Sequence, residues 1–170
     1  MTVAQRYHGL AAVGVCCRDR EGSSLLEFAI AVATLLTAII GIVSAALALS
    51  AYHYTANAAR EGARYAMVRG STWKVACAAP STYGCTATGN SVKAYLVAIA
   101  PTGMKSANTA VTTTWPGTTA AGTACYSGNG LNGPGCSVRV DVSYTFKMTL
   151  PLLPKKTLQF SSSSTMPISQ

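Results

Sequence analysis

Acidic side chains are scarce in this sequence. Its 170 residues include five Asp plus Glu and two His, and charged residues make up 11% of the chain. Soluble globular domains have about 25% charged residues, so the composition argues against an ordinary soluble enzyme. A hydrophobic fraction of 49% also excludes a disordered, highly charged tail. No G-x-S-x-G, H-E-x-x-H or phosphate-loop motif occurs, so we expect neither an enzyme activity nor a cofactor.

Charge is absent altogether from one long run. No charged residue lies between Phe28 and Ala51, and Leu, Ile, Val and Ala dominate this stretch. As a helix it would be about 36 Å long, against about 30 Å for the hydrocarbon core of a bilayer. The run therefore predicts one transmembrane helix at about residues 28–51.

Two other interpretations of this run are weaker. A buried core helix needs a domain large enough to surround it, and this chain is too short for that. A secretory signal peptide would be cleaved near Ala46–Ala48, which resembles an A-x-A site. That signal would need about 48 residues and an apolar core of about 20, whereas typical signals have about 15–30 residues and cores of about 7–15.

Four cysteines follow the membrane segment in a polar region of small residues: Cys77, Cys85, Cys125 and Cys136. They predict two disulfides and an oxidising compartment. Three pairings are possible, and the local one (77 with 85, 125 with 136) is favoured because each pair brackets a turn-rich loop. The spacings C-x7-C and C-x10-C do not suit zinc.

The numbers of Lys and Arg on the two sides of the membrane segment do not settle its orientation in the bilayer. The orientation is therefore taken from the cysteines, which place their region outside the cytoplasm and residues 1–22 inside.

A short charged leader ends at Gly22, and Glu27 and Phe28 follow at the mouth of the apolar helix. A carboxylate at the centre of a membrane helix costs about 3 kcal/mol, and less near the interface. This arrangement resembles the processing site of type IV prepilins, and of Tad (Flp-type) pilus proteins in particular. The resemblance implies that a prepilin peptidase cuts between Gly22 and Ser23, and that Glu27 pairs with the N-terminal ammonium of a neighbouring subunit. The alternative is that Glu27 sits at headgroup level, where the helix dipole favours a negative charge.

The helix is predicted to continue beyond the membrane segment. Alanines recur there at spacings of 3, 4 and 3 and form a small-residue stripe on one face. Its members are Ala56, Ala59, Ala63 and Ala66. A helix over residues 24–69 would be about 70 Å long. We therefore expect its apolar and small-residue faces to meet lipid and other helices.

The second motif lies in this continuation and reads Ala59, Arg60, Glu61, Gly62, Ala63, Arg64. It closely resembles the AREGAR segment of TadE-like proteins, which are pseudopilins or minor pilins of Tad pilus systems. The resemblance covers about residues 18–69 and extends to the rest only in general character. An alternative for the two arginines is a solvated juxtamembrane face that attracts anionic lipid headgroups.

Residues after Gly70 are rich in Thr, Ser, Ala and Gly. Strict alternation of apolar and polar side chains over residues 137–148 predicts a half-buried antiparallel strand. Further strands are expected at 109–115 and 158–166, with a loop at 116–135, a turn at 150–156, and a short helix capped by Asn90 and ended by Pro101. The expected fold is pilin-like α+β, with a long N-terminal transmembrane helix that extends into a small extracytoplasmic antiparallel-sheet domain. Its parts are the leader 1–22, the helix 23–70 and the domain 71–170. The three strands and the short helix of that domain are expected to lie against the outer half of the long helix.

Removal of residues 1–22 takes away three of the 13 basic and two of the five acidic side chains, which leaves ten and three. The remaining basic residues do not cluster with aromatics, so nucleic acid is not an expected partner. The resemblance implies assembly of a Tad type IVb pilus, with roles in surface attachment and biofilm. The implied partners are a prepilin peptidase, other Tad pilins and pseudopilins, the inner-membrane assembly platform and membrane lipid.

The expected location is the bacterial inner membrane, crossed once, with a cytoplasmic N-terminus and a periplasmic domain. Association through the helix is part of the same expectation. The sequence leaves three places open for the protein: incorporation into an extracellular pilus, the pilus tip, or the inner membrane. The alternative is an uncleaved single-pass anchor that presents an adhesive or binding domain. Loss of cleavage or of pili on substitution of Gly22 or Glu27 discriminates the two.

Overall fold

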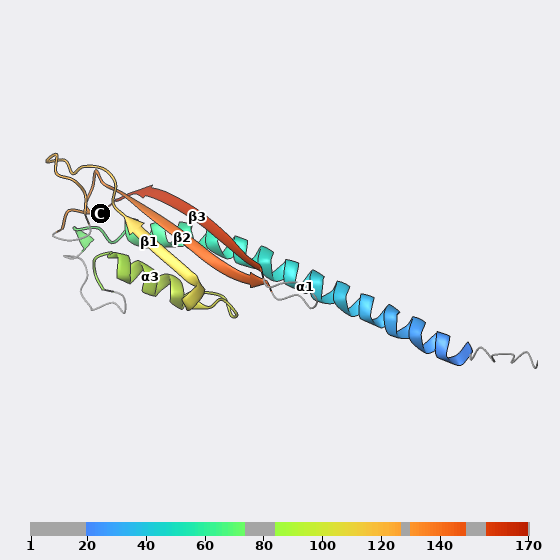
Figure 1. Ribbon diagram of the computed structural model, residues 1–170. Coiled ribbons are helices and arrows are strands. Elements are labelled where there is room, and N and C mark those ends of the chain that lie inside the picture. The colour runs from blue at the N-terminus through green and yellow to red at the C-terminus, as the bar shows by residue number, and fades with distance from the viewer. Residues whose placement is uncertain (1–19, 74–83, 127–129, 149–155, 170) are drawn as a thin grey trace, which may run out of the picture. The chain divides into compact units, whose positions relative to one another are not determined.

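The computed structural model describes residues 20–73, 84–126, 130–148 and 156–169 (Figure 1). In chain order the elements are helix α1 (Arg20–Met67), helix α3 (Gly89–Ala98), one turn of 3-10 helix (Ser106–Asn108) and strands β1 (Thr109–Thr114), β2 (Ser137–Met148) and β3 (Lys156–Pro167). The architecture is the predicted α+β class. The chain divides into two units, residues 1–38 and 39–170, and α1 contributes to both.

The described part of the first unit is the beginning of α1. Its large apolar side chains are exposed to the surroundings, and they include Leu25, Leu26, Phe28, Ile30, Leu35 and Leu36. The hydroxyl of Thr37 donates to the carbonyl of Ala33 at 2.8 Å, one turn earlier. This hydroxyl is thus satisfied within the helix, as apolar surroundings require.

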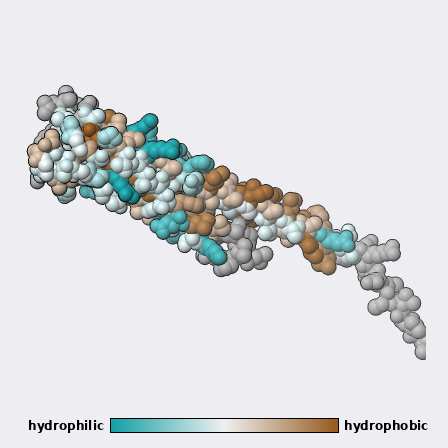
Figure 2. Space-filling view, turned by 90° about the horizontal axis from the view of Figure 1, so that it is seen from above, coloured by the Kyte–Doolittle hydropathy of each residue, from teal (hydrophilic) through white to brown (hydrophobic). Residues whose placement is uncertain are grey.

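Among the described residues, one helix is long enough and apolar enough to cross a membrane, and it covers Ser23–Met67. The most apolar window of this helix has none of its residues buried. In Figure 2 the hydrophobic colour is concentrated along this stretch of α1. A surface of this kind needs lipid or other apolar partners to cover it.

The second unit is built on a three-stranded antiparallel sheet with β2 in the middle. The side chains at even positions of β2 are buried from Val138 to Tyr144, whereas Arg139 and Lys147 are exposed. The period-2 pattern is therefore confirmed, and β2 has the predicted bounds. β1 ends one residue earlier than expected, and β3 is longer than expected at both ends.

The outer half of α1 packs against the sheet through its smallest side chains. Ala59, Ala63 and Ala66 are fully buried in a core shared with the valines of β2. A Cβ atom added at Gly62 would lie 3.0 Å from both Leu96 Cδ1 and Val140 Cγ1, so the absence of a side chain sets this close approach. The expectation that this stripe meets other helices is wrong for residues 59–66, because the chain's own α3 and β2 cover it.

Helix α3 lies beside β1 (Figure 1). Thr88 caps its N-terminus by a capping box, because the Thr88 hydroxyl accepts from the Ser91 amide at 3.2 Å and the Ser91 hydroxyl accepts from the Thr88 amide at 2.8 Å. The prediction that Asn90 is the cap is wrong, since Asn90 lies in the first turn of the helix. The buried contacts of α3 come from Val92 and Leu96.

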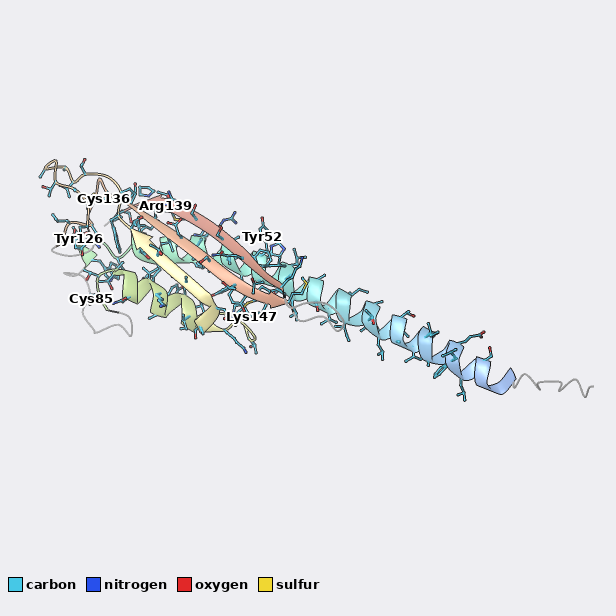
Figure 3. All side chains as sticks on the ribbon, viewed as in Figure 1. Tyr52, Cys85, Tyr126, Cys136, Arg139 and Lys147 are labelled. Atoms are coloured by element: carbon cyan, nitrogen blue, oxygen red, sulfur yellow. A yellow bond between two sulfur atoms is a disulfide. The ribbon has the colours of Figure 1, made fainter. Side chains whose placement is uncertain are left out.

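The loop before β2 is closed by the predicted Cys125–Cys136 disulfide, whose Cα atoms lie 5.8 Å apart. Isolated antiparallel bridges, among them Thr118 with Ala124, shape the rest of this loop. Cys85 is also disulfide-bonded. Cys77 lies outside the described residues, as do most of the leader and most of the turn expected at 150–156, so those predictions stay predictions. In Figure 3, Cys85, Tyr126 and Cys136 lie at the end of the domain opposite to Tyr52 and Lys147.

Candidate functional site

The expected processing residues lie in the first turns of α1, which begins at Arg20. Ser23, Glu27 and Phe28 are exposed, and no described cation forms an ion pair with Glu27. The bond between Gly22 and Ser23 lies in the helix end, where the first amides lack intrahelical acceptors. The Glu27 carboxylate thus lies about two turns from the start of α1, where it is open to a group from outside the chain.

The segment 59–64 divides into two halves with different environments. Ala59, Gly62 and Ala63 face the core, whereas the side chains of Arg60 and Arg64 are exposed. The division follows from helix geometry, because residues three or four apart share a face. The small residues therefore serve the packing of this chain, and the two guanidinium groups are free for contacts outside it.

Arg60 and Arg64 line a hollow of about 480 Å³ between α1 and β3, together with Asn57, Glu61 and Met166. Glu61 lies within the same hollow, but it forms no ion pair with either arginine. The ion pair found among the described residues lies elsewhere, on the sheet, where Arg139 binds Asp141 at 3.1 Å. The hollow therefore carries two arginines without a paired carboxylate.

A second hollow, of about 290 Å³, has His53, Asn57 and Glu61 on one side and Ile99 and Pro101 on the other. His53 and Glu61 are brought to the same rim, yet neither a hydrogen bond nor an ion pair joins them. No group of three or more His, Cys, Asp or Glu that could hold a metal occurs among the described residues. This arrangement offers no assembled acid–base pair.

Tyr54 lies near this hollow and is 7% exposed. Burial raises the pKa of its phenol, the Thr109 side chain acts to lower it, and Tyr144 raises it further. No described group makes a hydrogen bond of good geometry to the Tyr54 hydroxyl. Its ring meets the Tyr144 ring edge to face at 6.2 Å, so Tyr54 joins α1 to β2.

The aromatic contacts at the end of α1 were not predicted. The Tyr65 and Tyr95 rings stack at 4.5 Å, and the Arg69 guanidinium lies 4.0 Å from the Tyr65 centroid. The spacing of Tyr65 and Arg69, one turn apart on a helix, was the signal available in the sequence. No periodicity points to Tyr95, because its partner lies on another element.

A helix with an exposed apolar half and with its outer half packed on a three-stranded antiparallel sheet defines a pilin-like protein. A family model described as TadE-like protein matches residues 22–64. The match begins at Gly22, includes the whole apolar run and ends at Arg64, so this part of the chain is similar to TadE-like proteins. No curated protein and no solved structure gives a significant match.

The match to TadE-like proteins implies a role in Tad pilus biogenesis and association with the Tad pilus machinery. The family suggests the cell envelope as the location, and the long apolar helix is consistent with an anchor or a signal there. Its members are pilus-assembly proteins and are not known as enzymes. The sheet domain lies outside the matched residues.

Proposed function

We propose that this chain is a pseudopilin or minor pilin that is cut once after Gly22 and takes part in assembly of a Tad type IVb pilus. The observation that carries the proposal is the family match, which starts at Gly22 and spans the exposed apolar helix. The partners are a prepilin peptidase, other Tad pilins and pseudopilins, and the inner-membrane platform. Surface attachment and biofilm formation follow from the pilus.

Removal of the leader creates an ammonium group at Ser23. Glu27 is four residues further along the same helix, so its carboxylate lies one turn from the new N-terminus. An unpaired carboxylate in an apolar bundle is costly, and the ammonium of a neighbouring subunit neutralises it. The pairing thus favours a helix surrounded by other cut subunits over a helix alone in lipid.

The proposed topology places the N-terminus in the cytoplasm and the sheet domain in the periplasm. The Cys125–Cys136 disulfide supports it, since structural disulfides persist in oxidising compartments. The apolar stretch that follows Glu27 then spans the inner membrane, in contact with lipid before assembly.

The deciding experiment is the N-terminal sequence and intact mass of the protein recovered from membranes of cells with an active prepilin peptidase. A start at Ser23 supports the proposal. A start at Met1 contradicts it and leaves a membrane anchor, whereas a start near Leu49 indicates a secreted domain.

Three variants separate cleavage from assembly. Gly22→Ala is expected to block the cut, and Glu27→Ala is expected to leave the cut intact but abolish pili. Gly89→Ala is the matched control, because a Cβ there meets no atom within 4 Å and Gly89 lies in α3, outside the apolar helix. If pili form normally in the first two variants while surface binding falls on substitutions in residues 71–170, the alternative of an anchored binding domain is correct.

A further inference from the structure

Among the described residues no strand lies beside the outer edge of β3, since the sheet order is β1-β2-β3. None of the residues of β3 is buried, and its twelve residues carry one charged side chain, Lys156. Long edge strands with few charges are the places where a further strand can add. This edge is therefore a candidate interaction surface outside the segment that matches the family.

The backbone bonds show which groups of β3 are free. The amide of Ile168 donates to the carbonyl of Cys136 at 2.9 Å, in register with the β2–β3 ladder. Backbone groups of successive residues point to opposite sides of a strand, so the even-numbered residues of β3 bond to β2. The odd-numbered residues from Thr157 to Thr165 direct their amides and carbonyls outward, and none of these groups bonds to another described residue.

Two further observations describe this free edge. Pro167, which has no N–H, occupies the next outward-facing position, as expected for an edge that is not part of a ladder. Ser169 follows two residues later, and its amide donates to the Met67 carbonyl at 3.1 Å. At that point the outer edge of β3 therefore faces the last turn of α1.

The arginine hollow lies along the same edge. Its walls are Arg60 and Arg64 from α1 and Met166 from β3. Glu61 offsets one of the two charges, and the arginines have no ion-pair partner among the described residues. Met166 is flanked in β3 by Thr165, whose backbone groups face outward, so the free edge of β3 ends beside a hollow that carries two guanidinium groups without an ion-pair partner.

We propose that this edge and hollow form a groove that binds an extended acidic segment of another protein, which adds to β3 as a fourth strand. The outward amides and carbonyls of β3 pair with the backbone of that segment, which supplies affinity. Carboxylates on the face of the segment turned toward α1 bind Arg60 and Arg64, which supplies selectivity. The groove itself does not depend on processing at Gly22, whereas the exclusion of a second copy rests on the proposed removal of residues 1–22.

A second copy of this chain does not fit the groove. After loss of the leader the chain has three acidic residues, of which Asp141 is bound by Arg139 and Glu27 and Glu61 lie in α1. A centred antiparallel pairing of two β3 strands would also bring Lys156 of one copy near the arginines of the other. The occupant is therefore a different, acidic protein.

The test uses the full chain in zwitterionic detergent and a capped, fluorescent ten-residue peptide in which Glu alternates with Val. The matched peptide has Gln in place of Glu. Fluorescence anisotropy is expected to show at least about tenfold tighter binding of the Glu peptide, since each charge-assisted contact contributes about 1.5 kcal/mol or more. Arg60→Gln with Arg64→Gln should remove this preference, and the control pair Lys93→Gln with Lys105→Gln, which changes the net charge equally, should keep it.

The backbone contribution is tested separately. Ser163→Pro removes an outward amide of β3 and is expected to weaken binding of the Glu peptide at least about tenfold, whereas Ser163→Ala is expected to bind normally. A Glu peptide with N-methyl groups at alternate residues should fail to bind the unchanged protein, a result that does not depend on how well the proline variant folds. Slower hydrogen exchange at the odd-numbered amides of β3 should accompany binding.

Several results would overturn the proposal. These are equal binding of the Glu and Gln peptides, binding unaffected by the arginine pair, or full binding of the N-methylated peptide. Self-association of the chain that competes with the Glu peptide and is lost in Ser163→Pro would identify a second copy as the occupant, and it would equally refute an acidic partner.

Discussion

Gly62 occupies the point where α1 comes closest to α3 and β2. An added Cβ would lie 3.0 Å from Leu96 Cδ1 and from Val140 Cγ1, and 3.3 Å from Val92 Cγ1. Overpacking of a core costs about 1–3 kcal/mol, whereas replacing Gly by Ala in a helix gains about 1 kcal/mol. We expect Gly62→Ala to lower the free energy of unfolding by about 1 kcal/mol, measured by urea unfolding of the full chain in detergent.

The control for this prediction is Gly89→Ala, because a Cβ at Gly89 meets no atom within 4 Å. That variant is expected to unfold at the same urea concentration as the original chain, or a slightly higher one. Gly62→Val is expected to be more destabilised than Gly62→Ala. A Gly62→Val chain as stable as the original would show that α1 does not approach α3 as closely as the contacts indicate.

Tyr54 couples the stability of the domain to alkaline pH. Burial raises the pKa of its phenol above the ordinary value of 10.0. The folded state thus holds this proton more tightly than the unfolded state does, so the stabilisation is complete below pH 10 and is lost as the pH rises through the folded pKa. Tyr54→Phe is expected to remove this part of the alkaline loss in thermal melts above pH 10.

At neutral pH the same substitution is expected to change the stability by no more than about 1 kcal/mol, because the buried hydroxyl lacks a good hydrogen bond. Tyr95→Phe, which changes the tyrosine stacked on Tyr65, is the control and should leave the alkaline loss in place. A Tyr54→Phe chain that loses stability above pH 10 as steeply as the original would assign that loss to other groups.

Secondary-structure elements differ in how far the sequence predicts them. The twelve residues of β2 alternate strictly, and a half-buried strand repeats every two residues, so its bounds were predictable. The stripe of Ala59, Ala63 and Ala66 was recognised as one face of a helix, but not what covers it. A periodic pattern shows which residues share a face of a helix. It does not show which residues cover that face, because these, here Val92, Leu96 and Val140, come from segments distant in the chain.

The start of α3 was placed two residues too late for a related reason. Asn90 and Thr88 are both good capping residues, and the sequence alone does not show which one has extended backbone geometry. The structure gives Thr88 that geometry, with φ −120° and ψ 162°. The pair Thr88 and Ser91, three residues apart, was an overlooked signal for a capping box.

This assignment predicts different effects for two alanine variants. Thr88→Ala removes the cap and is expected to cost about 1 kcal/mol of folding free energy. Asn90→Ala replaces a residue within the first turn and is expected to cost less than about 0.5 kcal/mol. Urea unfolding of both variants measures the difference, and the reverse order would support the cap assigned from the sequence.

The Cys125–Cys136 disulfide closes the loop that leads into β2, across 11 residues. Constraint of the unfolded chain by a loop of this size stabilises the folded state by about 2–3 kcal/mol. We expect the variant with both cysteines replaced by Ser to lose stability by that amount under non-reducing conditions. Equal stability of the variant and the original would mean that the bridge is not formed in the mature protein.

At the scale of the whole molecule, α1 has two parts with opposite environments. Large apolar side chains are exposed from Leu25 to Leu49, whereas burial in the sheet domain begins at Ala51. The apolar run was predictable, because residues 28–51 lack charge. The pilin-like fold predicted that the outer half of α1 lies against the sheet and the short helix, and the shared core confirms it. Alanine spacing alone would have been equally compatible with contact between subunits.

This division predicts where the chain can be shortened. A chain that begins at Ser50 keeps the buried residues of α1, from Ala51 to Ala66, and loses the exposed apolar stretch. We expect it to be monomeric without detergent and to unfold cooperatively, as measured by size-exclusion chromatography and near-ultraviolet circular dichroism.

A chain that begins at Ser71 keeps α3 and the sheet, but it lacks the alanine face and the Met67 carbonyl that binds Ser169. Because the sheet then exposes its valine-lined face to water, this chain is expected to aggregate or to lose its near-ultraviolet signal. Cooperative unfolding of the shorter chain would show that the sheet and α3 fold without α1, and α1 would then be an appended anchor.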